Sequence, residues 1–153
     1  MFQGQTEESM SQYEAEVTEG VFPLGGVNDA LAQYFSGTSY MNTLVNDPDV
    51  PVTVANVSFE PGVRNNWHKH NGGFQIILAT AGEGWYQEEG QSPVKLRTGD
   101  VAVAKDGVKH WHGATADSWF SHLVITAGTV EWMEPVEDTV YTEIHRGFQN
   151  ASY

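Results

Sequence analysis

The sequence contains no cysteine, and its 7 lysine and arginine residues face 20 aspartate and glutamate residues, which gives a formal net charge of −13. Without cysteine there is no disulfide scaffold and no zinc, iron–sulfur or haem site with thiolate ligands. The negative charge disfavours nucleic-acid phosphates and anionic membrane surfaces as partners. There is no run of about 18 apolar residues and no secretory-signal pattern at the N-terminus, so we expect no membrane partner and a cytoplasmic location.

A chain of 153 residues is of single-domain size and can bury a sizeable core. Residues 1–25 are rich in glutamate and are expected to form a partly mobile extension. Helical spacing within 26–50 predicts a short N-terminal helix packed on the rest of the chain. In 51–127, short β-branched and aromatic runs between Gly, Pro and Asp are typical of an all-β barrel or sandwich. Residues 128–153 are expected to pack on this barrel, and 141–148 is compatible with a further strand.

Eight strands are expected in and around the β region, separated by segments with turn propensity. Two of these turns are expected at 71–74 and 82–84, where paired glycines provide backbone freedom. The expected strands are residues 53–59, 67–70, 75–81, 85–88, 94–96, 101–104, 110–114 and 119–126.

Five of the six histidines lie in this β region. Alternate residues of a strand point to the same face, so His68 and His70 project together, as do His110 and His112. Gln75 opens the next expected strand and can face the same interior. Two imidazoles, an amide oxygen and a third imidazole from a distant strand predict a site for one divalent transition metal: manganese, iron, nickel, copper or zinc. Calcium and magnesium are disfavoured because they prefer oxygen ligands.

Two spaced motifs, each with a glycine turn, a strand and a histidine, extend over residues 52–127. They read Gly62-x5-His68-x-His70-x4-Gln75-x6-Gly82 and Gly99-x7-Gly107-x2-His110. Together they resemble the two motifs of the cupin superfamily. The resemblance implies an all-β, antiparallel jelly-roll β-barrel with a metal held inside by three histidines and, usually, a glutamate.

The chain departs from the general cupin pattern at the glutamate position, which is Gln75 here, and at Lys105 and Ala114, where proline and asparagine are usual. A neutral amide in place of a carboxylate leaves a bound divalent metal about one charge unit more positive. This should lower the pKa of a bound hydroxyl group and strengthen anion binding. A poor or absent glutamine ligand and a weakly held metal are the alternative.

A narrower resemblance is to the small manganese-dependent cupins that include bacterial hydroxynitrile lyases, often grouped with carboxymuconolactone-decarboxylase-associated cupins. It rests on Gln75 and on the runs Lys109–Thr115, Val57–Gly62, Thr80–Trp85 and Val130–Glu134, and reaches most of the chain beyond the first 30 or so residues. It implies manganese, with His68, His70, Gln75 and His110 as ligands, and an active-site role for His122. In that group the glutamine follows the second histidine by four residues, whereas here the interval is five.

An open-sided metal beside a titratable base supports polarisation of an oxygen and proton transfer at that oxygen or the adjacent carbon. His122 is the candidate catalytic base. His112, two residues after a ligand, either shares the catalytic role or packs beside the ligands. We expect Trp67, Phe59 and Trp111 to line the substrate pocket, although tryptophan on barrel strands more often belongs to the core.

These features favour a metal-dependent enzyme that acts on a small hydroxylated or carbonyl substrate by Lewis-acid and histidine-base catalysis. Hydroxynitrile-lyase-like cleavage of a carbon–carbon bond is the specific case. A metal-dependent dioxygenase or isomerase, and a non-enzymatic small-ligand-binding cupin, remain the alternatives. Exposed barrel faces and the acidic N-terminal extension also lead us to expect a homodimer.

Overall fold

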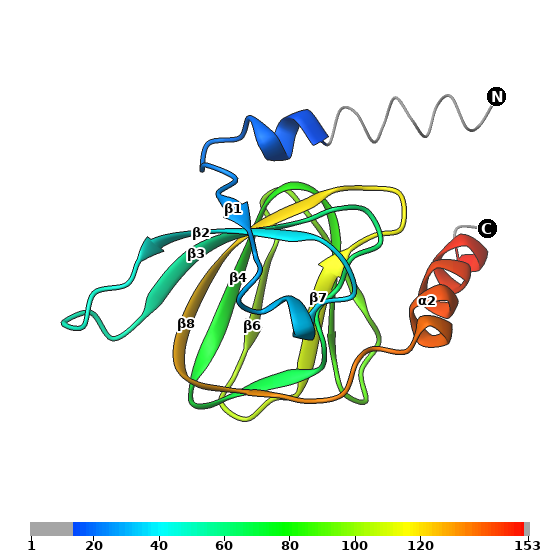
Figure 1. The fold of residues 1–153 in the computed structure, drawn as a ribbon. Helices are drawn as coiled ribbons and strands as arrows, with labels where there is room; N and C mark the ends of the chain where they lie inside the picture. Colours follow the sequence, from blue (N-terminus) through cyan, green and yellow to red (C-terminus); the bar gives the residue numbers. More distant parts are fainter. Residues whose placement is uncertain (1–13, 152–153) are drawn as a thin grey trace.

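One twisted β-sheet that curls into a barrel dominates the computed structural model, which describes residues 14–151, and the side chains up to residue 147 (Figure 1). A C-terminal helix packs on one side of the barrel. Residues 14–18 form a short helical segment near one end of the barrel. The elements are β1 (Gly26–Val27), η1 (Ala32–Tyr34), β2 (Ser39–Val45), β3 (Thr53–Phe59), β4 (His68–Glu88), β5 (Val94–Arg97), β6 (Val101–Ala104), β7 (His110–Ala114), β8 (Phe120–Trp132) and α2 (Asp138–Ala151).

The strands follow the order β1-β2-β3-β8-β4-β5, and β6 and β7 also pair with β4. All pairings are antiparallel except that of β7 with β4. The predicted all-β, mainly antiparallel fold is therefore confirmed. Because β4 is hydrogen-bonded to four other strands, it brings residues distant in the sequence to one interior.

The turns predicted at 71–74 and 82–84 are wrong, because β4 continues through both as one strand of 21 residues. At the first position Gly72 and Gly73 lie opposite the single Gly128 of β8, which makes a β-bulge. Gly72 and Gly128 have φ angles of 75° and 85°, which glycine adopts without strain. The extra residue changes the phase of the strand, so that His70 before it and Gln75 after it are both buried.

The segments outside the β region differ most from expectation. Within 26–50 the structure has β1, a single 3₁₀ turn and β2 in place of the predicted helix. Here Val27 pairs with β2 and Phe35 bridges to Asn65, and these contacts prevail over the helical spacing. Residues 141–148 belong to α2 and are not a strand. The predicted mobility concerns mainly residues 1–13, which lie outside the described residues.

Two of the three apolar clusters among the described residues lie on opposite sides of the barrel wall. The interior cluster includes Phe59, Ile77 and Phe120, which are fully buried. The second cluster lies under α2 and consists of Trp85, Trp111, Val136, Tyr141 and Ile144. Among the described residues, no helix is long and apolar enough to cross a membrane.

Arg64 fastens α2 to the barrel. Its Nη2 donates to the carbonyl of Val136 at 2.9 Å and pairs with the Asp138 carboxylate. Its guanidinium carbon lies 4.3 Å from the ring centre of Tyr141, whose hydroxyl donates to the Ala114 carbonyl at the end of β7. The helix is thus attached directly to the strand that carries two of the predicted site histidines.

Candidate metal centre and active site

Three histidines from two paired strands converge inside the barrel. His68 begins β4 and lies beside His110 of β7 in the strand pairing, and His112 follows on the same face of β7. Each offers a ring nitrogen, and the three nitrogens lie within 4.8 Å of one another. All three side chains are buried. The spacing and burial suit a group of ligands for one metal ion.

Backbone carbonyls hold two of these rings in a defined tautomer. The Nδ1 atoms of His68 and His110 lie 2.8 and 3.0 Å from the carbonyls of Asn66 and Val108. Because a carbonyl only accepts, both rings carry a proton on Nδ1 and present the Nε2 lone pair. Burial, with repulsion from His110, keeps the pKa of His68 well below its usual range, and burial lowers that of His110 to about 4. Both rings are therefore neutral near pH 7, the form that binds metals.

The side-chain carbonyl oxygen of Gln75 contacts the Nε2 atoms of two of the three histidines, His110 and His112. Its Oε1 lies 3.0 Å from His110 Nε2 and 3.2 Å from His112 Nε2, while its amide nitrogen donates to Thr126 Oγ1 at 3.2 Å. In these tautomers an oxygen acceptor faces nitrogen lone pairs, which repel it. A cation among these atoms would be attracted by the oxygen and nitrogen lone pairs alike. The residues therefore fit a bound metal ion.

His70 lies next to the triad without belonging to it. Its ring centre is 5.3 Å from that of His68 and 5.4 Å from that of His110. Both of its ring nitrogens are buried and have no hydrogen-bond partner among the described residues. Burial lowers its pKa, so this ring too is neutral near pH 7. Since buried polar atoms are nearly always paired, these two nitrogens also favour a metal ligand at this position.

A chain of hydrogen bonds connects His112 to His122. The backbone N–H of His112 donates to Asn65 Oδ1 at 3.0 Å, so the Asn65 amide nitrogen, 3.2 Å from His112 Nε2, is the donor there. His112 therefore carries its proton on Nδ1 and donates it to His122 Nε2, 2.8 Å away. Burial lowers the pKa of both rings, to about 4 for His122. The remaining nitrogen of His122, Nδ1, is buried and has no hydrogen-bond partner in the described part of the chain.

A cavity of about 200 Å³ opens beside these groups. His68, His70, Gln75 and His112 are among the polar residues that line it. None of the described residues that line it is lysine, arginine, aspartate or glutamate. The other lining residues are Asn28, Leu31, Phe35, Met41, Thr53, Ala55, Val57, Asn65, Val124, Thr126, Val130 and Trp132.

The three predicted pocket residues lie elsewhere. Trp67 and Trp111 each adjoin a histidine in the sequence, so strand alternation turns them to the opposite face, where they pack in the cluster under α2. Phe59 lies behind the site, with its ring 5.3 Å from that of His122, and does not line the cavity. His122 is also absent from the lining, and it reaches the cavity only through His112. The sequence prediction missed Phe35 and Met41, which lie in the segment where a helix was expected.

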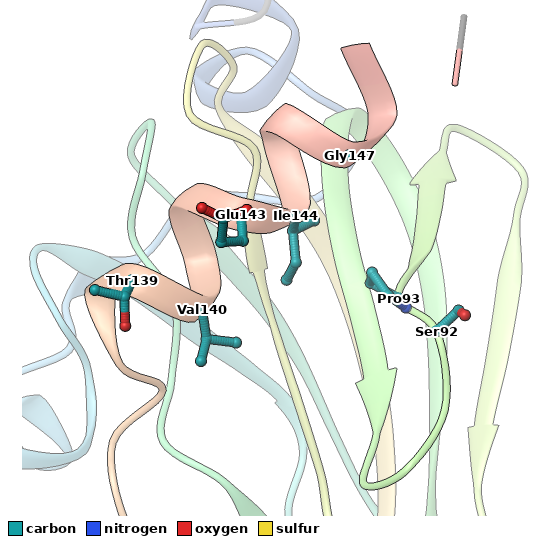
Figure 2. A pocket seen from close by; sticks show the side chains of 7 residues that line it. All are labelled: Ser92, Pro93, Thr139, Val140, Glu143, Ile144 and Gly147. Atoms are coloured by element: carbon teal, nitrogen blue, oxygen red, sulfur yellow. The ribbon is translucent and has the colours of Figure 1, made fainter. Parts of the chain in front are cut away.

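A larger hollow of about 590 Å³ lies on the outer surface, between α2 and the β4–β5 loop (Figure 2). Val140 and Ile144 of the helix face Pro93 of the loop across it. None of its lining residues is a histidine or belongs to the predicted site. The predicted site residues that line a cavity therefore line the smaller interior one.

The barrel with its interior histidine cluster defines the class of protein. Residues 55–126 match the cupin domain model, and the chain belongs to the cupin family. It is 41% identical over 115 residues to an (R)-mandelonitrile lyase from Granulicella tundricola, covering 72% of this chain and 87% of that protein.

Solved structures agree with this assignment. The chain resembles a cupin-like protein from Thermotoga maritima with a TM-score of 0.76 and 35% identity, over 81% of this chain and 96% of that one. A predicted oxalate decarboxylase from the same organism shares the fold, with a TM-score of 0.56 and 24% identity, over 65% of this chain and 84% of the other.

Proposed function

We propose that this protein is a metal-dependent lyase that cleaves a small cyanohydrin, such as mandelonitrile, into an aldehyde and hydrogen cyanide. The observation that carries the proposal is the set of neutral histidines and Gln75 around one cavity. The 41% identity to a protein named (R)-mandelonitrile lyase selects this chemistry among those that such a set supports.

The proposed metal is manganese, held by His68, His70, Gln75 and His110. A divalent metal in this position supplies a Lewis acid that polarises a substrate oxygen. The ligand side chains are uncharged, since burial keeps the histidines neutral and Gln75 replaces the usual carboxylate. The full charge of the ion is therefore available to the substrate.

The proposed base is the His112–His122 pair. His112 lines the cavity, where the substrate hydroxyl replaces the Asn65 amide as the donor to its Nε2. Nε2 then takes the hydroxyl proton while the Nδ1 proton of His112 passes to His122 Nε2, 2.8 Å away. The carbon–carbon bond to cyanide then breaks, the oxygen becomes the aldehyde carbonyl, and the pair returns one proton to cyanide. Because burial lowers the pKa of His122 to about 4, the charged pair readily gives the proton back.

The cavity lining favours an uncharged substrate. Leu31, Phe35, Val124 and Trp132 offer apolar contacts, and the lining contains no cation that would pair with a carboxylate or phosphate. An aryl or alkyl cyanohydrin has one hydroxyl group for the polar side and an apolar remainder for the other.

The experiment combines elemental analysis of the purified protein with a mandelonitrile cleavage assay that follows aldehyde release. We expect about one manganese per chain and activity in the wild type, with a large loss in His122→Ala and in His112→Ala. Lys69→Ala is the matched control, because it lies between two proposed ligands but is only half-buried and weakly paired with Glu131.

Each outcome is decisive for a separate part of the proposal. A metal-loaded wild type without cyanohydrin cleavage refutes the lyase, and oxygen uptake with a catechol then favours the dioxygenase alternative. Full activity in His122→Ala refutes the base. The ligand set is tested by metal content: we expect loss of metal in His70→Ala and retention in His112→Ala, and the reverse pattern would make the compact triad the true ligand group.

A further inference from the structure

One buried oxygen in the lining of the interior cavity has no hydrogen-bond partner among the described residues. Of the described residues that line this cavity, only His70 and Asn28 have buried side-chain nitrogen or oxygen atoms in this state. The proposed metal accounts for His70. Neither the metal nor the proposed proton transfer accounts for Asn28 Oδ1, and buried acceptors are nearly always paired.

The side-chain amide of Asn28 is held in one orientation. Its Nδ2 donates to Ser39 Oγ at 3.3 Å, and the backbone N–H of Asn28 donates to the Ser39 carbonyl at 2.9 Å. Both residues are buried, with exposed fractions of 5% and 3%. Because Ser39 engages the amide nitrogen, the atom left over is the oxygen, which only accepts hydrogen bonds. A partner of Asn28 Oδ1 must therefore carry an O–H or N–H group.

Asn28 belongs to a different wall of the cavity from the proposed metal ligands. It follows β1, and in the strand order β2, β3 and β8 lie between β1 and β4, the strand that carries His68, His70 and Gln75. The next lining residues along the chain, Leu31 and Phe35, are apolar. A ligand with one oxygen at the metal therefore places its apolar remainder on the side of the cavity to which Asn28 belongs.

We propose that Asn28 Oδ1 accepts a hydrogen bond from a hydroxyl group on the ring of the substrate. This inference rests on the proposed lyase function and narrows its substrate class to cyanohydrins of hydroxylated aromatic aldehydes. A cavity of about 200 Å³ is small for a ligand site and suits a single ring with small substituents. A ring without the hydroxyl leaves the buried acceptor unpaired, which weakens its binding.

The first test measures binding, so that it does not depend on cleavage. Benzyl alcohols keep the ring and the carbinol hydroxyl of a mandelonitrile but lack the cyanide group. Isothermal titration calorimetry on the metal-loaded full chain compares meta- and para-hydroxybenzyl alcohol with the corresponding methylbenzyl alcohols, which have a similar size and no donor on the ring. We expect the wild type to bind one hydroxy compound about tenfold or more tighter than the methyl compound with the same ring position.

Three variants locate the source of this preference. Asn28→Leu keeps the side-chain size but removes the acceptor, so the two compounds should bind about equally well. Asn42→Leu is the matched control: Asn42 follows the lining residue Met41 on β2, alternation turns it away from the cavity, and the preference should stay at the wild-type value. Ser39→Ala keeps Asn28 but removes the acceptor of its amide nitrogen, and it serves if Asn28→Leu misfolds. In this variant the preference should fall several-fold, and circular dichroism establishes folding of each variant.

The mandelonitrile cleavage assay separates this inference from the lyase proposal. If the wild type cleaves no cyanohydrin, a hydroxyl preference that is lost in Asn28→Leu still supports Asn28 as the acceptor and refutes the lyase function alone. A wild type that cleaves mandelonitrile but binds the hydroxy and methyl compounds equally at both ring positions overturns the inference and leaves the lyase function intact. A hydroxyl preference that is unchanged in the folded Asn28 and Ser39 variants overturns it as well.

Discussion

The replacement Gln75→Glu tests the electrostatics of the site most directly. In the wild type an uncharged amide oxygen lies 3.0 Å from His110 Nε2, and burial lowers the pKa of His110 to about 4. A carboxylate in the same position stabilises the protonated imidazole. The variant should therefore raise the pKa of His110 in the metal-free protein.

The size of the shift follows from the contact distance. Unit charges about 3 Å apart at an effective dielectric constant near 20 attract by about 5 kcal/mol. Desolvation of the new carboxylate offsets part of this energy, and opposite charges this close shift a pKa by about 1 to 3 units in practice. We therefore expect the pKa of His110 to move from about 4 to roughly 5–7.

Proton NMR of the imidazole C–H signals of metal-free protein measures this pKa as a function of pH. Gln87→Glu is a matched control, because Gln87 also lies on β4 but accepts a hydrogen bond from Trp111 on the outer side of the strand. The control should leave the pKa of His110 near 4. A folded Gln75→Glu protein in which His110 still titrates near 4 would refute the arrangement, since the carboxylate could not then lie beside the ring.

Three further perturbations test other parts of the structure. Because the pKa of His110 and of His122 is about 4 in the folded protein and near 6.5 when unfolded, the unfolded state binds more protons between these values. In urea unfolding of metal-free protein, the free energy of unfolding should thus fall as the pH drops from about 6.5 to 4. The fall is up to about 1.4 kcal/mol per pH unit for each of the two histidines. A free energy of unfolding that does not change over this range would contradict the burial of the two rings. His145→Ala removes the ring nitrogen Nε2 to which the Trp85 and Ala116 N–H groups donate and should cost about 2 kcal/mol of stability. Arg146→Ala, at an exposed neighbour, should cost little. In Gly73→Ala the new methyl would meet a backbone carbonyl of β8 at 2.1 Å, so we expect a lower melting temperature and loss of bound metal.

The strand pattern of the site could be predicted because it is local. Alternation along a strand places His68 with His70, and His110 with His112, and all four are buried together. The same rule, applied to the neighbouring tryptophans, already places them on the other side of the strands. Trp111 was expected in the pocket because it is aromatic, although alternation turns it away from the histidines. It packs under α2 instead.

The cavity wall could not be predicted, because it depends on contacts between distant segments. Met41 reaches the cavity from β2, which pairs with β3, and Phe35 reaches it from the segment before β2, where it bridges to Asn65. The helical spacing in residues 26–50 concealed both. Trp132 reaches it because β8 extends six residues past its expected end and pairs with the start of β4. His122 is connected to the cavity only by its hydrogen bond to His112. This contact depends on a distance between side chains, which the spacing of residues in the sequence does not predict.

Because of the bulge at Gly72 and Gly73, the number of residues between two ligands does not by itself determine whether they face the same interior. An inserted residue would normally rotate everything after it to the opposite face of the strand, but the two glycines and Gly128 absorb it within one pairing step. Gln75 thereby stays beside His110 although its interval from His70 is five residues. A sequence profile that requires the interval of four would reject this chain, so surveys of such barrels should allow a gap wherever consecutive glycines follow the second histidine.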